Sequence, residues 1–129
     1  MNTRERARFD GLFEQVLEQL PGELHELIER TPVIVEDAPD PKMLAELDID
    51  PDEDVLCGLH TGTPITERSV EHPVEYPEYI HLFREGILDT AGGWDDVEAV
   101  REQIRITLLH EIGHHYGLDE DALERYGYG

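Results

Sequence analysis

Two histidines and a glutamate near the end of the sequence have the types and spacing to hold a metal ion and activate water. His110 and His114 are four residues apart, and Glu111 directly follows the first histidine. Side chains at this spacing lie on one face of an α-helix, so both imidazoles could bind a single Zn²⁺ ion. Glu111 would lie about 100° around the helix, where it could hydrogen-bond a water beside the metal. H-E-x-x-H therefore predicts one catalytic zinc ion with a general base next to it.

The residues after this motif make a metal site a more specific prediction. H-E-x-x-H alone would be only suggestive in a chain this rich in histidine and glutamate. Gly117 at the eighth position and Glu120 at the eleventh extend the match. The alternative is that the motif is only a polar seam on an amphipathic helix, which would put two histidines into the most apolar helix of the chain. We therefore favour the metal site.

A catalytic zinc ion needs a third protein ligand and an open fourth position. Only nine residues follow Glu120, so a ligand downstream must be Asp119, Glu120, Asp121 or Glu124. We expect Glu120, because the turn at Gly117 would bring the eleventh position back beneath the metal. Asp119 is the close alternative. The same acids could instead cap a short final helix.

A hydrolytic site also needs a group that stabilises an oxyanion in the transition state. Tyr126, Tyr128 and His115 are the candidates within reach in the sequence. Spacing does not single out one of them, and surface or core packing is the favoured role for each.

Composition limits the kinds of partner. The net charge of −21 should repel phosphate backbones, so we expect no nucleic acid partner, whereas cations and basic peptides would be attracted. Adaptation to a salty cytoplasm would produce the same acidity. The single cysteine, Cys57, excludes an intramolecular disulfide, and the charged N-terminus lacks the apolar run of a signal peptide. We expect a cytoplasmic monomer with no membrane span.

The N-terminal part of the sequence predicts two helices. Apolar residues recur at helical spacing across residues 4–20, which gives one stripe that faces the core. Thr3 is the expected N-cap of this helix. Pro21 and Gly22 then end it, and a shorter helix around residues 24–28 follows.

Three segments have the pattern of short strands, namely 32–36, 55–60 and 79–84. An acidic connection at 37–54 holds one helical turn around residues 43–47. The alternation in YIHLFR predicts a half-buried strand. An edge strand of this kind could align an extended substrate, so Ile80, Leu82 and Arg84 are candidate substrate-binding positions.

A long helix carries the motif. It is expected to begin near residues 94–96, where acids favour the first turn, and to end at Gly117. Its broad apolar stripe predicts a central, nearly buried helix. The elements together predict one α+β domain over residues 1–129, with a small mixed sheet of about three to four strands packed on this helix and with helices at the N-terminus.

Three stretches resemble one family, the small bacterial zincin-like metallopeptidases. They are HEIGHHYGLDEDALE at 110–124, GLHTGTPITERS at 58–69 and YIHLFR at 79–84. The resemblance implies a minimal zincin fold, His110 and His114 as zinc ligands, Glu111 as catalytic base and the acid at 120 as third ligand. His60 departs from the aromatic expected in that family's G-L-Y-x-G-x-P.

The function we expect is hydrolysis of a peptide or protein substrate, with Glu111 as general base. A non-catalytic acidic module that binds metal or another protein is the alternative. A metal-dependent RNA hydrolase is disfavoured, because related H-x-x-x-H sites lack the glutamate and the charge has the wrong sign for RNA. The sequence has no methionine after the motif, which excludes a methionine turn.

Overall fold

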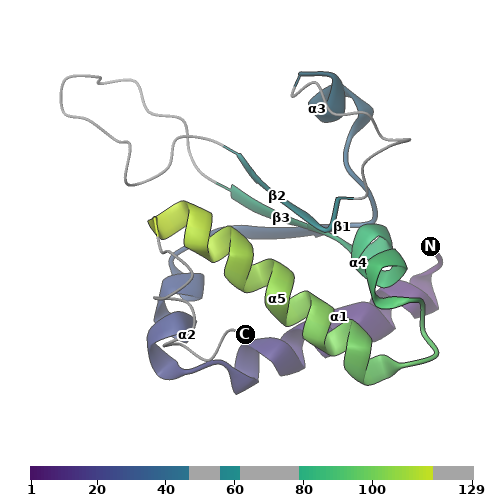
Figure 1. Cartoon of the computed structure of the whole chain (residues 1–129), viewed down its shortest axis with the longest axis horizontal. Helices are drawn as coiled ribbons and strands as arrows, with labels where there is room; N and C mark the ends of the chain where they lie inside the picture. Colours follow the sequence, from purple (N-terminus) through teal and green to yellow (C-terminus); the bar gives the residue numbers. More distant parts are fainter. Residues whose placement is uncertain (47–55, 62–78, 118–129) are drawn as a thin grey trace.

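The structure is a computed structural model, and it describes residues 1–46, 56–61 and 79–117. It combines helices with a small sheet (Figure 1), in agreement with the α+β class predicted from the sequence. In chain order the elements are α1 (Thr3–Gln19), α2 (Gly22–Glu29), β1 (Val33–Glu36), α3 (Pro41–Glu46), β2 (Gly58–Thr61), β3 (Tyr79–Phe83), α4 (Arg84–Ala91) and α5 (Val97–Tyr116).

The three described strands form one mixed sheet in the order β1-β3-β2. β1 pairs with β3 in parallel, with Val33 opposite Ile80, and β2 pairs with β3 antiparallel, with Gly58 opposite Leu82. The expectation that residues 79–84 form an edge strand is therefore wrong. β3 is hydrogen-bonded on both sides, and in the described part of the chain the edges belong to β1 and β2.

The candidate substrate positions on that strand have structural roles instead. Ile80 and Leu82 are fully buried and belong to the hydrophobic core. Arg84 is the first residue of α4, and its side chain is engaged in ion pairs. Four consecutive residues of β3 are buried, so both faces of this strand are covered. The alternation of apolar and polar residues in YIHLFR predicted that one face of the strand would be exposed. The structure differs because His81, which lies between the two apolar residues, is also buried.

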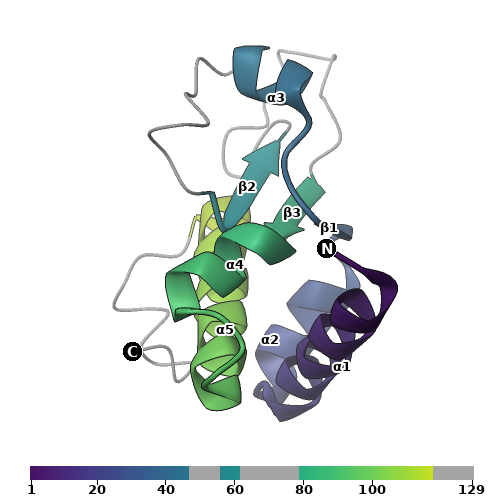
Figure 2. The same cartoon turned by 90° about the vertical axis from the view of Figure 1, so that its right-hand side faces the viewer.

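The core lies between the sheet and the two long helices. Figure 2 shows α1 and α5 side by side beneath the sheet. The apolar stripe predicted for residues 4–20 is the buried face of α1. The broad stripe predicted for the last helix is also buried, so α5 is the central helix of the fold. The core members on α1 and α5 are Phe9, Leu12, Val16, Val100, Ile104, Leu108, Leu109 and Ile112.

Local signals fix the ends of these helices. The Asn2 side chain accepts a hydrogen bond from the Glu5 backbone N–H, so Asn2 caps α1, one residue before the expected Thr3. Asp96 caps α5 in the same way, at the acidic run that predicted its start. Gly117 ends α5 in the left-handed region with φ 67°, as expected for a glycine after a helix. The helix α4 was not predicted.

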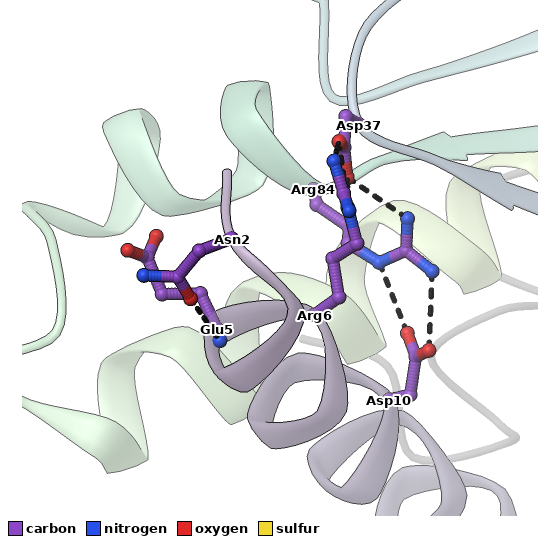
Figure 3. Close-up of polar contacts among 6 residues, drawn as sticks. All are labelled: Asn2, Glu5, Arg6, Asp10, Asp37 and Arg84. Atoms are coloured by element: carbon purple, nitrogen blue, oxygen red, sulfur yellow. Dashed lines mark hydrogen bonds and ion pairs between the residues drawn. The ribbon is translucent and has the colours of Figure 1, made fainter.

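An arginine at the start of α4 joins three elements (Figure 3). The guanidinium of Arg84 donates to both carboxylate oxygens of Asp10 on α1, at 3.0 and 3.1 Å, and to Asp37 after β1, at 3.0 Å. Arg6 of α1 also donates to Asp37. The Arg84 side chain is only 12% exposed, whereas those of Asp10 and Asp37 are 47% and 24% exposed, so these charge-assisted bonds are partly shielded from water. They fasten α1 to the sheet.

Candidate metal and catalytic site

The two motif histidines lie side by side on the last turns of α5. Both are exposed, their Nε2 atoms are 3.0 Å apart, and their rings meet edge to face at 84°. Two zinc–nitrogen bonds at a tetrahedral angle would place the nitrogens about 3.3 Å apart. A shift of a few tenths of an ångström would therefore let both nitrogens bind one ion. The type and spacing of these two donors suit two of the three protein ligands that a catalytic Zn²⁺ ion needs.

The protonation state of His110 suits metal binding. The pKa of His110 is lowered below its ordinary value. The larger cause is partial burial of the imidazole, and the smaller one is repulsion from His114. A lower pKa favours the neutral imidazole, which is the form that binds a metal. The imidazole is therefore ready to act as a ligand at neutral pH.

Glu111 differs from the two histidines because it is buried. The residue is only 7% exposed, and its neighbours Ile112 and Leu108 are fully buried. This loss of solvation raises the pKa of Glu111 to about 7. A carboxylate with such a pKa can accept a proton and release it near neutral pH, as a general base must. A cation bound beside it would favour the ionised form.

The edge strand β2 lies directly against this glutamate. A Cβ atom added at Gly58 would lie 3.2 Å from Cγ of Glu111 and 2.8 Å from Cγ2 of Thr107. The strand therefore packs on α5 at the turn that carries Glu111, and Figure 2 shows β2 next to one end of α5. Sequence reasoning did not identify Gly58 or Thr107. The available signal was a glycine within a strand pattern, which often marks a close backbone approach.

A hydrogen-bonded cluster anchors the end of α5. The Tyr116 hydroxyl donates to the backbone oxygen of Leu27 at 3.2 Å and lies 3.0 Å from Oγ1 of Thr31, which also donates to Leu27. Thr31 is buried. These bonds connect the helix that bears the histidines to the end of α2, so the imidazole pair sits on a fixed support.

Several predicted site residues lie outside the described residues. They are Asp119, Glu120, Tyr126 and Tyr128, together with the side chain of His115. Within the described ranges, no three potential ligand side chains gather at one point. The third zinc ligand and the oxyanion-stabilising group therefore stay predictions.

The same parts of the chain contain no helix that combines the length and apolar character needed to cross a membrane.

The sequence matches the model of a known protein family. A family model described as zincin-like metallopeptidase matches residues 28–128, well over half of the chain. The match includes β2, β3 and the whole of α5. It confirms the resemblance recognised in the sequence. No curated protein matches the chain.

Proposed function

Since the chain belongs to the zincin-like metallopeptidase family, we propose that it is a zinc-dependent peptidase whose reaction centre is the C-terminal end of α5. One observation carries the proposal. The Nε2 atoms of two exposed histidines converge to 3.0 Å, and the residue between them in the motif is a buried glutamate with a pKa of about 7. A ligand pair and a base are thus within one helical turn.

His110 and His114 would hold the zinc ion, with Glu120 as the third ligand and Asp119 as its alternative. The bound ion would supply a Lewis acid that polarises the substrate carbonyl and lowers the pKa of water. Two neutral imidazoles and one carboxylate would leave a net charge of +1 at the ion. Such an ion would acidify its water less than one with three neutral ligands, so Glu111 would supply much of the activation of the water.

Glu111 would accept a proton from the attacking water as the water oxygen bonds to the peptide carbon. It would then deliver that proton to the nitrogen of the leaving amine as the C–N bond breaks. Burial raises the pKa of this carboxyl in the metal-free protein, which favours acceptance of a proton, and a bound cation would keep the group ionised beforehand. Tyr126, Tyr128 and His115 remain candidates for the hydrogen bond to the oxyanion.

The substrate would lie along β2. This strand uses one edge to pair with β3, and it borders Glu111 through Gly58. An extended peptide could pair with the other edge and bring its carbonyl to the end of α5. The net charge of −21 would favour basic peptides. This role replaces the one expected for residues 79–84.

The test combines a zinc titration with a peptide-library digest of the zinc-loaded protein, in which wild type is compared with Glu111→Gln. We expect both proteins to bind zinc and only wild type to cleave peptides. Equal cleavage by the two would exclude Glu111 as the base. A wild-type protein that binds zinc without cleaving would instead favour the non-catalytic module.

A further inference from the structure

Gly58 occupies a point where the fold leaves no room for a side chain. A Cβ atom there would come within 2.8 Å of Cγ2 of Thr107, 3.0 Å of the His81 backbone oxygen and 3.2 Å of Cγ of Glu111. These atoms belong to α5 and to the neighbouring strand β3. Gly58 is therefore enclosed by the helix that carries the glutamate and by the centre of the sheet.

The three neighbours differ in how easily they can move. The oxygen of His81 belongs to the backbone of the central strand. Thr107 is β-branched and therefore stiff at χ1, and its hydroxyl accepts a hydrogen bond from Gln103 at 3.2 Å. Glu111 has an unbranched side chain with three rotatable bonds. An added Cβ atom would therefore force a shift of Thr107 or of the strand, and it would also displace the side chain of Glu111, which is the most flexible of the three neighbours.

The strand itself is held in place from its other side. The Phe83 backbone N–H donates to the Cys57 oxygen at 2.8 Å, and Gly58 pairs with Leu82. A Cβ atom at Gly86 of α4 would lie 1.8 Å from the Leu56 oxygen, so α4 also packs directly on the segment before β2. The segment 56–58 is thus fixed between α4 and α5 and has little freedom to retreat from Glu111.

We propose that Gly58 is a positioning residue, which fixes the reach of the Glu111 side chain by packing bare backbone against its Cγ. The inference rests on the proposed peptidase function, because it assigns a purpose to the contact through the role of Glu111 as base. Gly58 itself touches no reacting atom. Catalytic groups must be held within about 0.5 Å of their productive geometry, so a displacement of the Glu111 carboxylate beyond that distance would slow the reaction.

The contact can be tested without any enzymatic assay. Thermal unfolding of the metal-free protein would measure the cost of Gly58→Ala in three backgrounds: wild type, Glu111→Gln and Glu111→Ala. Glutamine keeps Cγ and alanine lacks it. We expect Gly58→Ala to lower the melting temperature equally in the first two backgrounds and clearly less in the third. An equal loss in all three would overturn the inference.

The functional consequence is tested on the zinc-loaded protein. We expect Gly58→Ala to reduce kcat tenfold or more at a temperature where the variant is folded, with KM and zinc affinity within about twofold of wild type. Thr107→Ser removes the nearer methyl group and keeps the hydroxyl, so it should restore part of the lost kcat. Gly11→Ala is the control, because a Cβ at this exposed position meets nothing within 4 Å.

The outcomes separate the two proposals. A wild-type protein that binds zinc but hydrolyses no peptide refutes the peptidase function, and the unfolding experiment still decides whether position 58 acts on Glu111. An active wild type whose Gly58→Ala variant keeps full kcat refutes the positioning role alone.

Discussion

The Nε2 atoms of His110 and His114 lie 3.0 Å apart on the exposed end of α5, close to the separation that two ligands of one zinc ion require. Zinc should therefore stabilise the folded protein. At a free concentration a hundred times its Kd, the expected gain is about 2.7 kcal/mol. Unfolding with zinc and with a chelator measures it. His114→Ala should abolish the gain, whereas His25→Ala, at a half-exposed histidine that pairs with Glu29, should leave it unchanged.

Burial of Glu111 predicts that the free energy of unfolding of the metal-free protein depends on pH. The pKa of this carboxyl is 4.5 in the unfolded chain and about 7 in the folded protein. Between pH 4.5 and pH 7 the folded protein therefore holds a proton that the unfolded chain has lost. Stability should fall as the pH rises from 4.5 to 7 and stay level above that. Glu111→Gln removes this loss, and at pH 8 it should be more stable than wild type by about 2–3 kcal/mol. Urea unfolding in chelator from pH 4 to pH 8 compares them. If the stability of the two proteins changed with pH in the same way, burial of Glu111 would not be the cause of the pH dependence.

Replacement of Arg84 should lower the stability of the protein more than replacement of an arginine with a single ion pair on the surface. Arg84→Met removes the bonds to Asp10 and Asp37, which should cost about 2–3 kcal/mol. Arg105→Met is the matched control, since that arginine makes an i,i+3 pair with Glu102 and should cost less than about 0.5 kcal/mol. Urea unfolding at pH 7 measures both. Similar losses would show that the shielded pairs add little.

The same cluster predicts a response to acid. Hydrogen bonds from Arg6, with a further contribution from Arg84, lower the pKa of Asp37 below its ordinary value of 3.8. Its contribution to stability is therefore complete above pH 3.8 and is lost as the pH falls through the lower folded value. Asp37→Asn should be less stable than wild type at pH 6, and the difference should narrow under strong acid. Circular dichroism during acid titration would follow this, and a constant difference would contradict it.

Tyr116 should matter for stability through its hydroxyl group. Tyr116→Phe loses the bonds to Leu27 and Thr31 and should cost about 1 kcal/mol. It should also weaken zinc binding, because the end of α5 becomes less firmly held. Tyr79→Phe, at an exposed tyrosine, is expected to change stability by less than about 0.5 kcal/mol. Unfolding and zinc titration of both variants would test this, and unchanged zinc affinity in Tyr116→Phe would limit the anchor to a structural role.

Local patterns predicted the parts of the fold that depend on nearby residues. The helical spacing of α1 and α5, the acids at the start of α5 and the glycine at 117 each act within a few positions, so their consequences can be read directly from the sequence. The pairing of the motif histidines is equally local, because one helical turn brings them together.

Long-range packing could not be predicted in the same way. Whether β3 lies at the edge or the centre of the sheet depends on β1, more than forty residues earlier, and on β2. The helix α4 was missed because its sequence REGILDTA contains a glycine and polar residues, and its stability comes from contacts with the sheet and α5. The closeness of Gly58 to Glu111 likewise exists only after β2 has packed on α5.

The strand order also determines when the site can be assembled. β3 is the centre of the sheet, yet it follows both of its neighbours along the chain. During synthesis on the ribosome, β1 and β2 therefore emerge before residues 79–83, with which both of them pair, and α5 comes later still. The helix that carries the imidazole pair is therefore synthesised after all three described strands. We expect zinc to bind a finished scaffold, unlike the small domains that need the ion in order to fold.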